Sequence, residues 1–178
     1  MRCFIAIDLP DEIRKELVKV QAELPKENTK LLAVKPENIH LTLKFLGEID
    51  GTQENKIKKI LEQLKLSKFT AKLSSVGIFS LAFVRVVWVG LEPKEEFVKI
   101  HNMIDNELEK IGFRKDKIWE THVTAARVKW LKNKEDFIKS IEKIKVKQLE
   151  FNVNNIKLKK STLVPEGPVY EDIVGINL

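Results

Sequence analysis

The chain has 178 residues, of which 43% are hydrophobic and 33% are charged. This composition excludes an intrinsically disordered chain, and the length predicts one compact domain that spans residues 1–178. Cys3 is the only cysteine, which excludes a disulfide within the chain. Because Cys3 lies in an apolar stretch, we expect a buried and unreactive thiol.

Lysine and arginine number 32 against 26 aspartate and glutamate residues, which gives a net charge of +6 and favours anionic partners. Between Arg127 and Lys160, 11 basic residues stand against 4 acidic ones. This basic stretch is either a solvated lysine-rich surface or a binding surface for an anionic partner. No segment is apolar enough to span a bilayer and the start does not resemble a signal peptide, so we expect a cytoplasmic protein without membrane contacts.

In chain order, the hydrophobic pattern predicts about seven strands with four amphipathic helices between them. The strands are expected at 3–7, 39–46, 69–76, 85–91, 121–128, 148–158 and 161–164. Asp11 and Thr52 are candidate caps of the first two helices, and Pro93 is expected to open the third. The fourth helix carries an apolar stripe from Phe137 to Ile144.

The order strand, helix, strand, helix occurs twice, over residues 3–66 and again over residues 85–146. This duplication predicts an α+β fold with two pseudo-symmetric lobes, each a mainly antiparallel sheet covered by helices. A central cleft between the lobes is the natural place for a ligand.

Two of the three histidines occur in one repeated pattern: histidine, an apolar residue, threonine, an apolar residue. The pattern occupies residues 40–43 and residues 122–125. In a strand, residues two apart point to the same side, so His40 projects with Thr42, and His122 projects with Thr124. Each pair falls on the second strand of its half, so the two pairs are expected to face each other across the cleft.

Such a site suits acid–base chemistry at a phosphodiester. Two imidazoles titrate near neutral pH, so one accepts a proton while the other donates one, and threonine hydroxyls donate hydrogen bonds to phosphate oxygens. This chemistry requires no metal and no cofactor. The alternative is that both histidines are ordinary strand residues. The third, His101, lies on the apolar stripe of a helix, which predicts a structural histidine.

Other kinds of site lack their motifs. The chain has no glycine-rich phosphate loop for ATP, and it has neither the HExxH motif nor a cysteine–histidine cluster for zinc. We therefore expect no ATP and no metal at the site.

The sequence around these motifs resembles the 2H phosphoesterases, specifically the LigT-like RNA 2′,3′-cyclic phosphodiesterases, also called 2′-5′ RNA ligases. The similar segments are 2–10, 34–48, 77–79, 85–91, 122–127, 161–163 and 167–170. The resemblance covers nearly the whole chain. The sequence departs from the family pattern at Ala33, where an aromatic residue is frequent, and at Thr121, where proline is frequent.

The resemblance implies an enzyme that hydrolyses the terminal 2′,3′-cyclic phosphate of RNA, such as a tRNA fragment, to a 2′-phosphate. We expect this enzyme to be a monomer. By the same resemblance, His40 protonates the leaving 3′-oxygen and His122 activates water. Thr42 and Thr124 hold the nonbridging oxygens. Two alternatives stay open: reversible 2′-5′ RNA ligation at the same site, and a noncatalytic RNA-binding module.

Two further residues are candidates for substrate binding. The resemblance favours Arg127, although strict alternation points it away from His122 unless a bulge re-aims it. Alternation places Lys44 on the side of His40 and places Phe45 in the core. Three other aromatic residues are candidates for base stacking, and at least two of them are expected in the core: Phe79, Phe83 and Trp88.

Overall fold

The computed structural model describes all residues from 1 to 178, which form nine strands, four α-helices and one short 3-10 helix. In chain order these are β1 (Arg2–Asp8), α1 (Asp11–Glu23), β2 (Thr29–Ala33), η1 (Pro36–Asn38), β3 (His40–Glu48), α2 (Gly51–Gln63), β4 (Phe69–Ile78), β5 (Val86–Glu92), α3 (Lys94–Glu109), β6 (His122–Leu131), α4 (Lys134–Ile141), β7 (Glu150–Val153), β8 (Asn155–Val164) and β9 (Gly167–Asn177). None of the helices has the length and apolar character that crossing a membrane would need.

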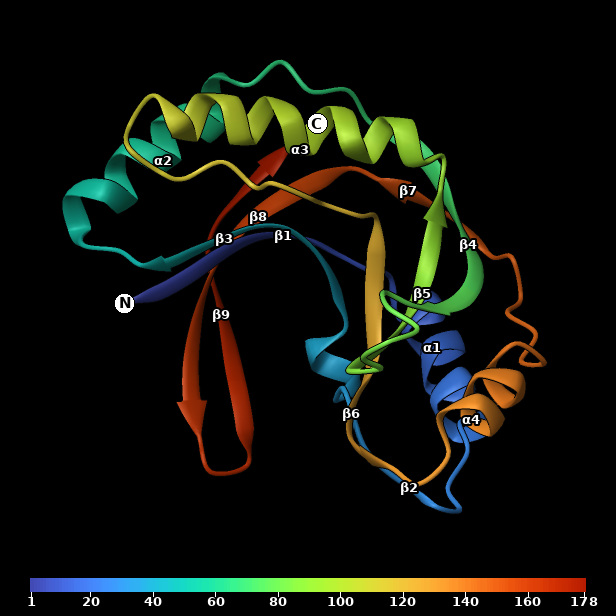
Figure 1. Cartoon of the computed structure of the whole chain (residues 1–178). Helices are drawn as coiled ribbons and strands as arrows, with labels where there is room; N and C mark the ends of the chain where they lie inside the picture. Colours follow the sequence, from blue (N-terminus) through green and yellow to red (C-terminus); the bar gives the residue numbers. More distant parts are fainter.

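The strands form two antiparallel sheets, which confirms the predicted fold class. The first sheet has the order β3-β1-β8-β9, and the second has the order β2-β6-β5-β4-β7. Figure 1 shows α2 and α3 over the first sheet, and α1 and α4 beside the second. Two arms project from the body in the same direction: the hairpin of β8 and β9, and the pair of β2 and β6.

The two halves of the chain are interlocked rather than stacked end to end. Helix α1 contacts β6 of the second sheet, and α3 contacts β3 of the first. The apolar stripes of both helices enter one core of 27 buried residues, with Leu17 on α1 and Phe97 on α3 fully enclosed. This shared core fixes the position of one sheet relative to the other, because neither sheet can move without disrupting helices from both halves.

Several predicted boundaries need correction. The segment expected as one strand at 148–158 is two strands, β7 and β8, and the predicted strand at 161–164 is the end of β8. Strands β2 and β9 were not predicted, because their residues are exposed or half-exposed on both faces and show no clear alternation. Helix α2 is capped by Asp50 instead of Thr52: its carboxylate accepts a hydrogen bond from the backbone of Gln53 at 2.8 Å.

A bulge in β3 changes which side chains face the cleft. Consecutive residues of β1 pair with Thr42 and Lys44, so Leu43 is an extra residue in the ladder. Leu43 and Lys44 are therefore both buried, and Phe45 returns to the face of Thr42 with 69% of its surface exposed. The predictions that Lys44 faces the substrate and that Phe45 lies in the core are wrong, because they assumed a regular strand.

Strand β6 has a bulge at the equivalent place. Consecutive residues of β5 pair with Thr124 and Ala126, and Ala125 is the extra residue. Ala125 and Ala126 are both fully buried, so Arg127 returns to the face of His122. In each half the bulge lies three residues after the histidine. The repeat therefore preserves this irregularity as well as the two side chains of the motif.

Candidate active site

A cavity of about 420 Å³ lies between the two sheets and brings the four predicted residues together. His40 and Thr42 reach it from β3, and His122 and Thr124 reach it from β6. Both arms contribute further lining residues, among them Leu32 on β2 and Tyr170 on β9. Figure 1 shows how the arms flank this region of the molecule.

The backbone orients both imidazoles in the same way. His40 Nδ1 lies 2.7 Å from the carbonyl oxygen of Asn38, and His122 Nδ1 lies 2.8 Å from the carbonyl oxygen of Glu120. A carbonyl only accepts hydrogen bonds, so each Nδ1 carries the proton and donates it. In a neutral ring, Nε2 is then the basic nitrogen. In each histidine, Nε2 is thus the ring nitrogen that is available to a ligand.

The two Nε2 atoms differ in their partners. His40 Nε2 lies 2.9 Å from the hydroxyl oxygen of Thr42 and, in the neutral ring, accepts its hydrogen bond. His122 Nε2 forms no hydrogen bond within the protein. A phosphate that enters the cavity therefore competes for the Thr42 hydroxyl on one side and meets a free imidazole nitrogen on the other.

Burial lowers the pKa of both histidines. Desolvation lowers the pKa of His40 from 6.5 to about 4, against the opposing effect of the hydrogen bond to Asn38. Desolvation also lowers the pKa of His122 from 6.5. Aromatic rings provide part of this apolar surrounding: Phe4 lies 4.9 Å from the His40 ring, and Phe79 meets His122 edge-on at 4.7 Å. Both imidazoles are therefore neutral at pH 7 in the free protein.

Cations that lack carboxylate partners line the cavity. Arg2, Lys35 and Arg127 form no ion pair within the protein, and Glu166 is the single acidic lining residue. The pKa of Tyr170 is raised by burial, while the charges of Arg127 and Arg2 act in the opposite direction. The structure thus brings Arg127 to the site, as the resemblance favoured. Sequence reasoning missed Arg2 and Tyr170 as site residues, although both lie in segments that carry the resemblance.

Asn38 links one arm to His40. Its side-chain nitrogen donates a hydrogen bond to the carbonyl of Pro168 at 2.8 Å, and its own carbonyl accepts the proton of His40 Nδ1. The residue is buried even though the short helix η1 lies at the surface. Asn38 therefore couples the position of the hairpin of β8 and β9 to the orientation of the imidazole.

The prediction that at least two of the three candidate stacking residues lie in the core is wrong. Phe79 is 48% exposed and Phe83 is 71% exposed, both at the connection between β4 and β5. Trp88 is half-buried and covers Gly77, where an added Cβ would lie 2.3 Å from its ring. Phe79 is thus the exposed aromatic residue in direct contact with a motif histidine.

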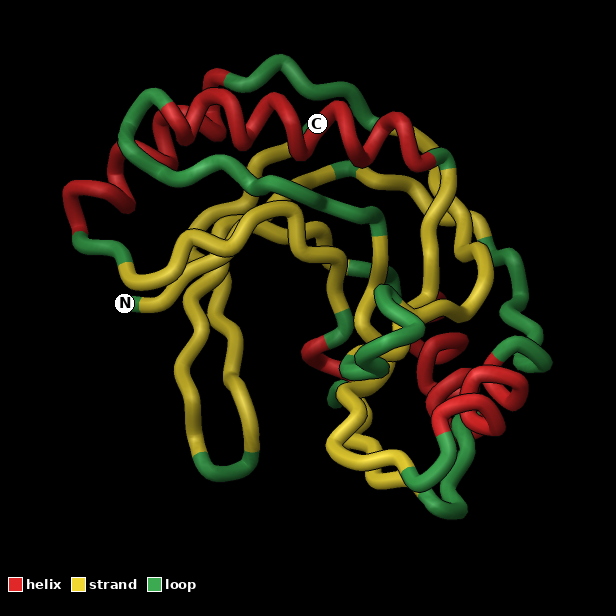
Figure 2. Tube along the Cα trace, viewed as in Figure 1, coloured by secondary structure: helices red, strands yellow, loops and turns green.

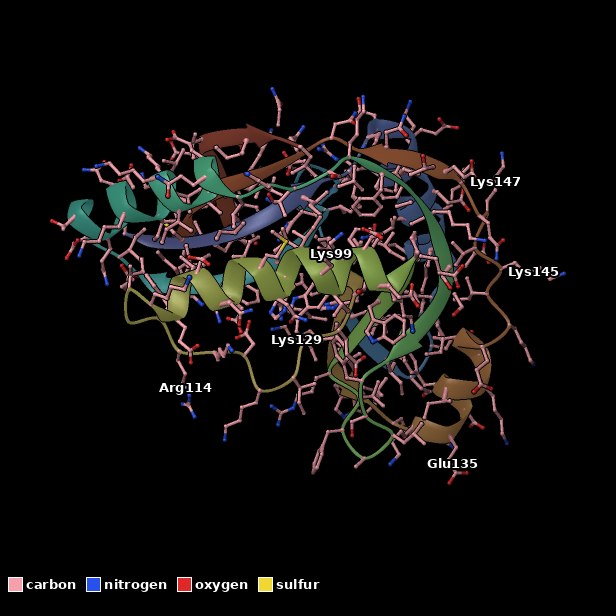
Figure 3. All side chains as sticks on the ribbon, turned by 90° about the horizontal axis from the view of Figure 1, so that it is seen from above. Lys99, Arg114, Lys129, Glu135, Lys145 and Lys147 are labelled. Atoms are coloured by element: carbon pink, nitrogen blue, oxygen red, sulfur yellow. The ribbon has the colours of Figure 1, made fainter.

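Lys44 lies behind β3, on the opposite side from the cavity. Its Nζ lies 2.5 Å from Asp105 Oδ1 and 3.1 Å from Asp116 Oδ1, and it donates to the carbonyl of Arg114 at 2.7 Å. Figure 3 shows the Arg114 side chain directed away from the body, so only its backbone takes part. The predicted role of Lys44 in substrate binding is therefore replaced by a structural one.

The same cluster holds the long connection between α3 and β6, which has little regular structure (Figure 2). His101 is buried as predicted, and its Nε2 lies 3.1 Å from Asp116 Oδ2. Its ring stacks on Trp119 at 4.5 Å, and Trp119 Nε1 donates to the carbonyl of Thr42 at 3.2 Å. The connection next supplies the Glu120 carbonyl that orients His122, so it contacts both motifs.

Three residues of this cluster also offer ligand atoms within 4.8 Å of one another: His101, Asp105 and Asp116. The ammonium group of Lys44 already contacts both carboxylates and supplies a positive charge beside them. A metal ion would have to displace this buried ammonium. We therefore assign the cluster a structural role.

The basic stretch from Arg127 to Lys160 does not form one surface. Lys157 and Lys159 each pair with both Asp8 and Asp172, at 2.6–2.9 Å. Burial would raise the pKa of Asp8, but these two lysines outweigh it and lower that pKa. Figure 3 shows Lys145 and Lys147 at an outer edge of the molecule. Arg127 is the one basic residue of this stretch that lines the cavity.

The comparisons with known proteins agree with the duplication. The family model described as LigT like Phosphoesterase matches twice, over residues 7–88 and 89–170. The chain belongs to the LigT-like phosphoesterase family. Each matched half contains one copy of the motif, and each half supplies strands to both sheets. This family match confirms the resemblance inferred from the sequence.

Relatives of this LigT-like chain are similar over nearly their whole length. An RNA 2′,3′-cyclic phosphodiesterase of Methanocaldococcus jannaschii is 42% identical, covering 97% of this chain and 98% of the relative. One of Thermotoga maritima is 36% identical, covering 96% and 92%. The structure of TT0787 of Thermus thermophilus has a TM-score of 0.83 at 27% identity, covering 100% and 98%. Escherichia coli LigT complexed with 3′-AMP has a TM-score of 0.79 at 26% identity, covering 99% and 97%.

Proposed function

We propose that the protein hydrolyses the terminal 2′,3′-cyclic phosphate of RNA to a 2′-phosphate. The observation that carries this proposal is that two imidazoles, each paired with a threonine, reach one cavity from two sheets. The relatives named RNA 2′,3′-cyclic phosphodiesterase support the reaction, and E. coli LigT complexed with 3′-AMP supports a nucleotide ligand. The lining residues come from both halves of the chain, so the two halves together form one site.

In the proposed reaction, water attacks phosphorus as the bond from phosphorus to the 3′-oxygen breaks. His122 Nε2 accepts the proton of the water, and protonated His40 gives its Nε2 proton to the leaving 3′-oxygen. Thr42 and Thr124 donate hydrogen bonds to the nonbridging oxygens, where negative charge grows in the transition state. Arg127 adds positive potential on the same face.

The low pKa of His40 means that its role as proton donor requires a change in protonation when the substrate binds. A proton donor must be protonated when the substrate is bound, and a pKa of about 4 leaves His40 neutral at pH 7. A phosphate anion next to the ring favours the imidazolium and raises its pKa. We therefore propose that substrate binding raises the pKa of His40, so that His40 is protonated in the complex. His122 stays neutral and acts as the base.

This condition predicts the direction of the pH dependence. Both histidine pKa values lie below 6.5 in the free protein, so the singly protonated pair exists only at acidic pH. The bell-shaped profile of kcat/KM, which reports the free enzyme, is expected to have its maximum below pH 6.5. The profile of kcat, which reports the complex, should extend to higher pH. Rates measured from pH 4 to 9 test this, and a kcat/KM that still rises above pH 8 would contradict it.

The proposed chemistry needs no metal ion, so activity is expected to survive chelation. Incubation with excess EDTA, followed by removal of the chelator, should leave kcat within about twofold of the untreated enzyme. An untreated sample passed through the same column is the control. A loss that added Mg²⁺, Mn²⁺ or Zn²⁺ restores would instead indicate a metal-dependent reaction.

The reaction itself is tested by the position of the phosphate in the product. An RNA oligonucleotide that ends in a 2′,3′-cyclic phosphate is incubated with the protein. Mass spectrometry detects the added water, and sensitivity to a phosphatase specific for 3′-phosphates gives the position of the phosphate. A terminal 2′-phosphate is expected. A 3′-phosphate would mean that the 2′-oxygen leaves, and a 2′-5′-linked product would favour ligation.

A further inference from the structure

The face of the second sheet that lines the cavity continues beyond it along β2 and the end of β6. Leu32 and Arg127 are directly opposite each other in this ladder, and both line the cavity. Lys30 lies two residues before Leu32 on β2 and therefore points to the same side. Trp130 is directly opposite Lys30, so it shares that side as well.

This continuation is exposed, aromatic and positively charged. Trp130 is 53% exposed, although a tryptophan gains more than most side chains from burial. Segments 29–35 and 127–132 contain no carboxylate, and they carry five cations, none of which forms an ion pair: Lys30, Lys35, Arg127, Lys129 and Lys132. The fold therefore neither covers the ring nor neutralises the charges around it.

The register places this surface beyond the first nucleotide. Thr124 and Arg127 pair with residues of β5 that are two positions apart. Arg127 and Trp130 pair with residues of β2 that are also two positions apart. Four positions at a rise of about 3.4 Å correspond to roughly 14 Å along the sheet. A nucleoside whose phosphate lies at Thr124 does not reach Trp130, whereas a nucleotide further along the same strand does.

We propose that Lys30 and Trp130 form a strand-binding surface for the RNA that leads to the reactive phosphate. One base stacks on the indole of Trp130, and the neighbouring ammonium group of Lys30 binds a backbone phosphate. This rests on the proposed function and names the substrate class: single-stranded RNA several nucleotides long, in preference to a cyclic mononucleotide. Continuity with the cavity and the lack of carboxylates favour a polyanion over a protein partner.

The test compares two substrates that share the reacting group. One is a hexanucleotide that ends in a 2′,3′-cyclic phosphate, and the other is 2′,3′-cyclic AMP. Trp130→Ala is expected to raise KM for the hexanucleotide about 10-fold through the lost stacking and to leave the rate on the mononucleotide unchanged. Lys30→Ala should reduce the slope of log KM against log salt concentration by about 0.7 for the lost phosphate contact.

Matched variants separate this role from a structural one. Trp130→Phe keeps a stacking ring and should retain most of the affinity. Lys145→Ala removes an equally exposed cation after α4, well away from Lys129 (Figure 3), and should change neither KM nor the salt slope. Unchanged activity on the mononucleotide shows that each variant is folded.

The outcomes distinguish the two proposals. If Trp130→Ala and Lys30→Ala hydrolyse the hexanucleotide with the KM of the wild type, the strand-binding surface is wrong and the proposed function stands. If the wild type hydrolyses neither substrate, the proposed function fails. The surface is then tested by fluorescence anisotropy with a labelled hexanucleotide: about 10-fold weaker binding by Trp130→Ala supports it, and equal binding overturns it.

Discussion

Replacement of His122 by alanine is expected to lower kcat on an RNA with a 2′,3′-cyclic phosphate end by about 10²–10⁴-fold. The physical reason is that His122 Nε2 is oriented by the Glu120 carbonyl and has no other partner, so nothing else at that position accepts the proton of water. The same range is expected for His40→Ala. Initial rates at saturating substrate measure the effect.

The double variant His40→Ala/His122→Ala provides an internal control. Groups that act together in one proton-transfer step are strongly non-additive, so the double variant should be little slower than either single variant. Both imidazoles are only half-buried, so thermal unfolding should stay close to that of the wild type. A single variant that folds normally and keeps nearly full kcat would exclude the two-histidine mechanism.

The sequence was sufficient to predict the parts of the site that depend on local spacing. Histidine and threonine two residues apart share a face of any strand, so the placement of Thr42 beside His40 follows from the pattern alone. The internal repeat also predicted two antiparallel sheets with helices, and the structure confirms this fold. These inferences need no knowledge of which strand lies next to which.

The positions after each motif were not predictable in this way. A bulge is decided by how a strand pairs with its neighbour, and β1 and β5 lie far from β3 and β6 in sequence. One extra residue reverses the alternation for everything that follows, which exchanges the faces of Lys44 and Phe45. Arg127 reaches the cavity for the same reason. The two carboxylates that Lys44 contacts lie 61 and 72 positions further along the chain, where no local pattern reveals them.

Replacement of Lys44 by alanine is expected to destabilise the protein by about 3–5 kcal/mol. The Lys44 side chain is 2% exposed, and its ammonium group pairs with Asp105, whose side chain is 6% exposed. Its removal leaves a buried carboxylate without its partner and removes the hydrogen bond to Arg114. For a chain of this size, each kcal/mol lowers Tm by about 2–4 °C, so Tm should fall by roughly 10 °C. Calorimetry or urea unfolding measures the change.

Two comparisons separate the unpaired charge from the lost volume of the side chain. Lys44→Met keeps most of the volume and should still be strongly destabilised, whereas adding Asp105→Asn to it should restore part of the loss by removing the unpaired charge. Lys58→Ala removes a lysine whose partner Glu54 is one helical turn away at the surface, and it should cost less than about 1 kcal/mol. A Tm for Lys44→Ala equal to that of Lys58→Ala would refute the structural role of the cluster.

Because the cluster holds the connection that orients His122 and contacts the Thr42 backbone, loss of Lys44 should also lower kcat at temperatures where the variant is still folded.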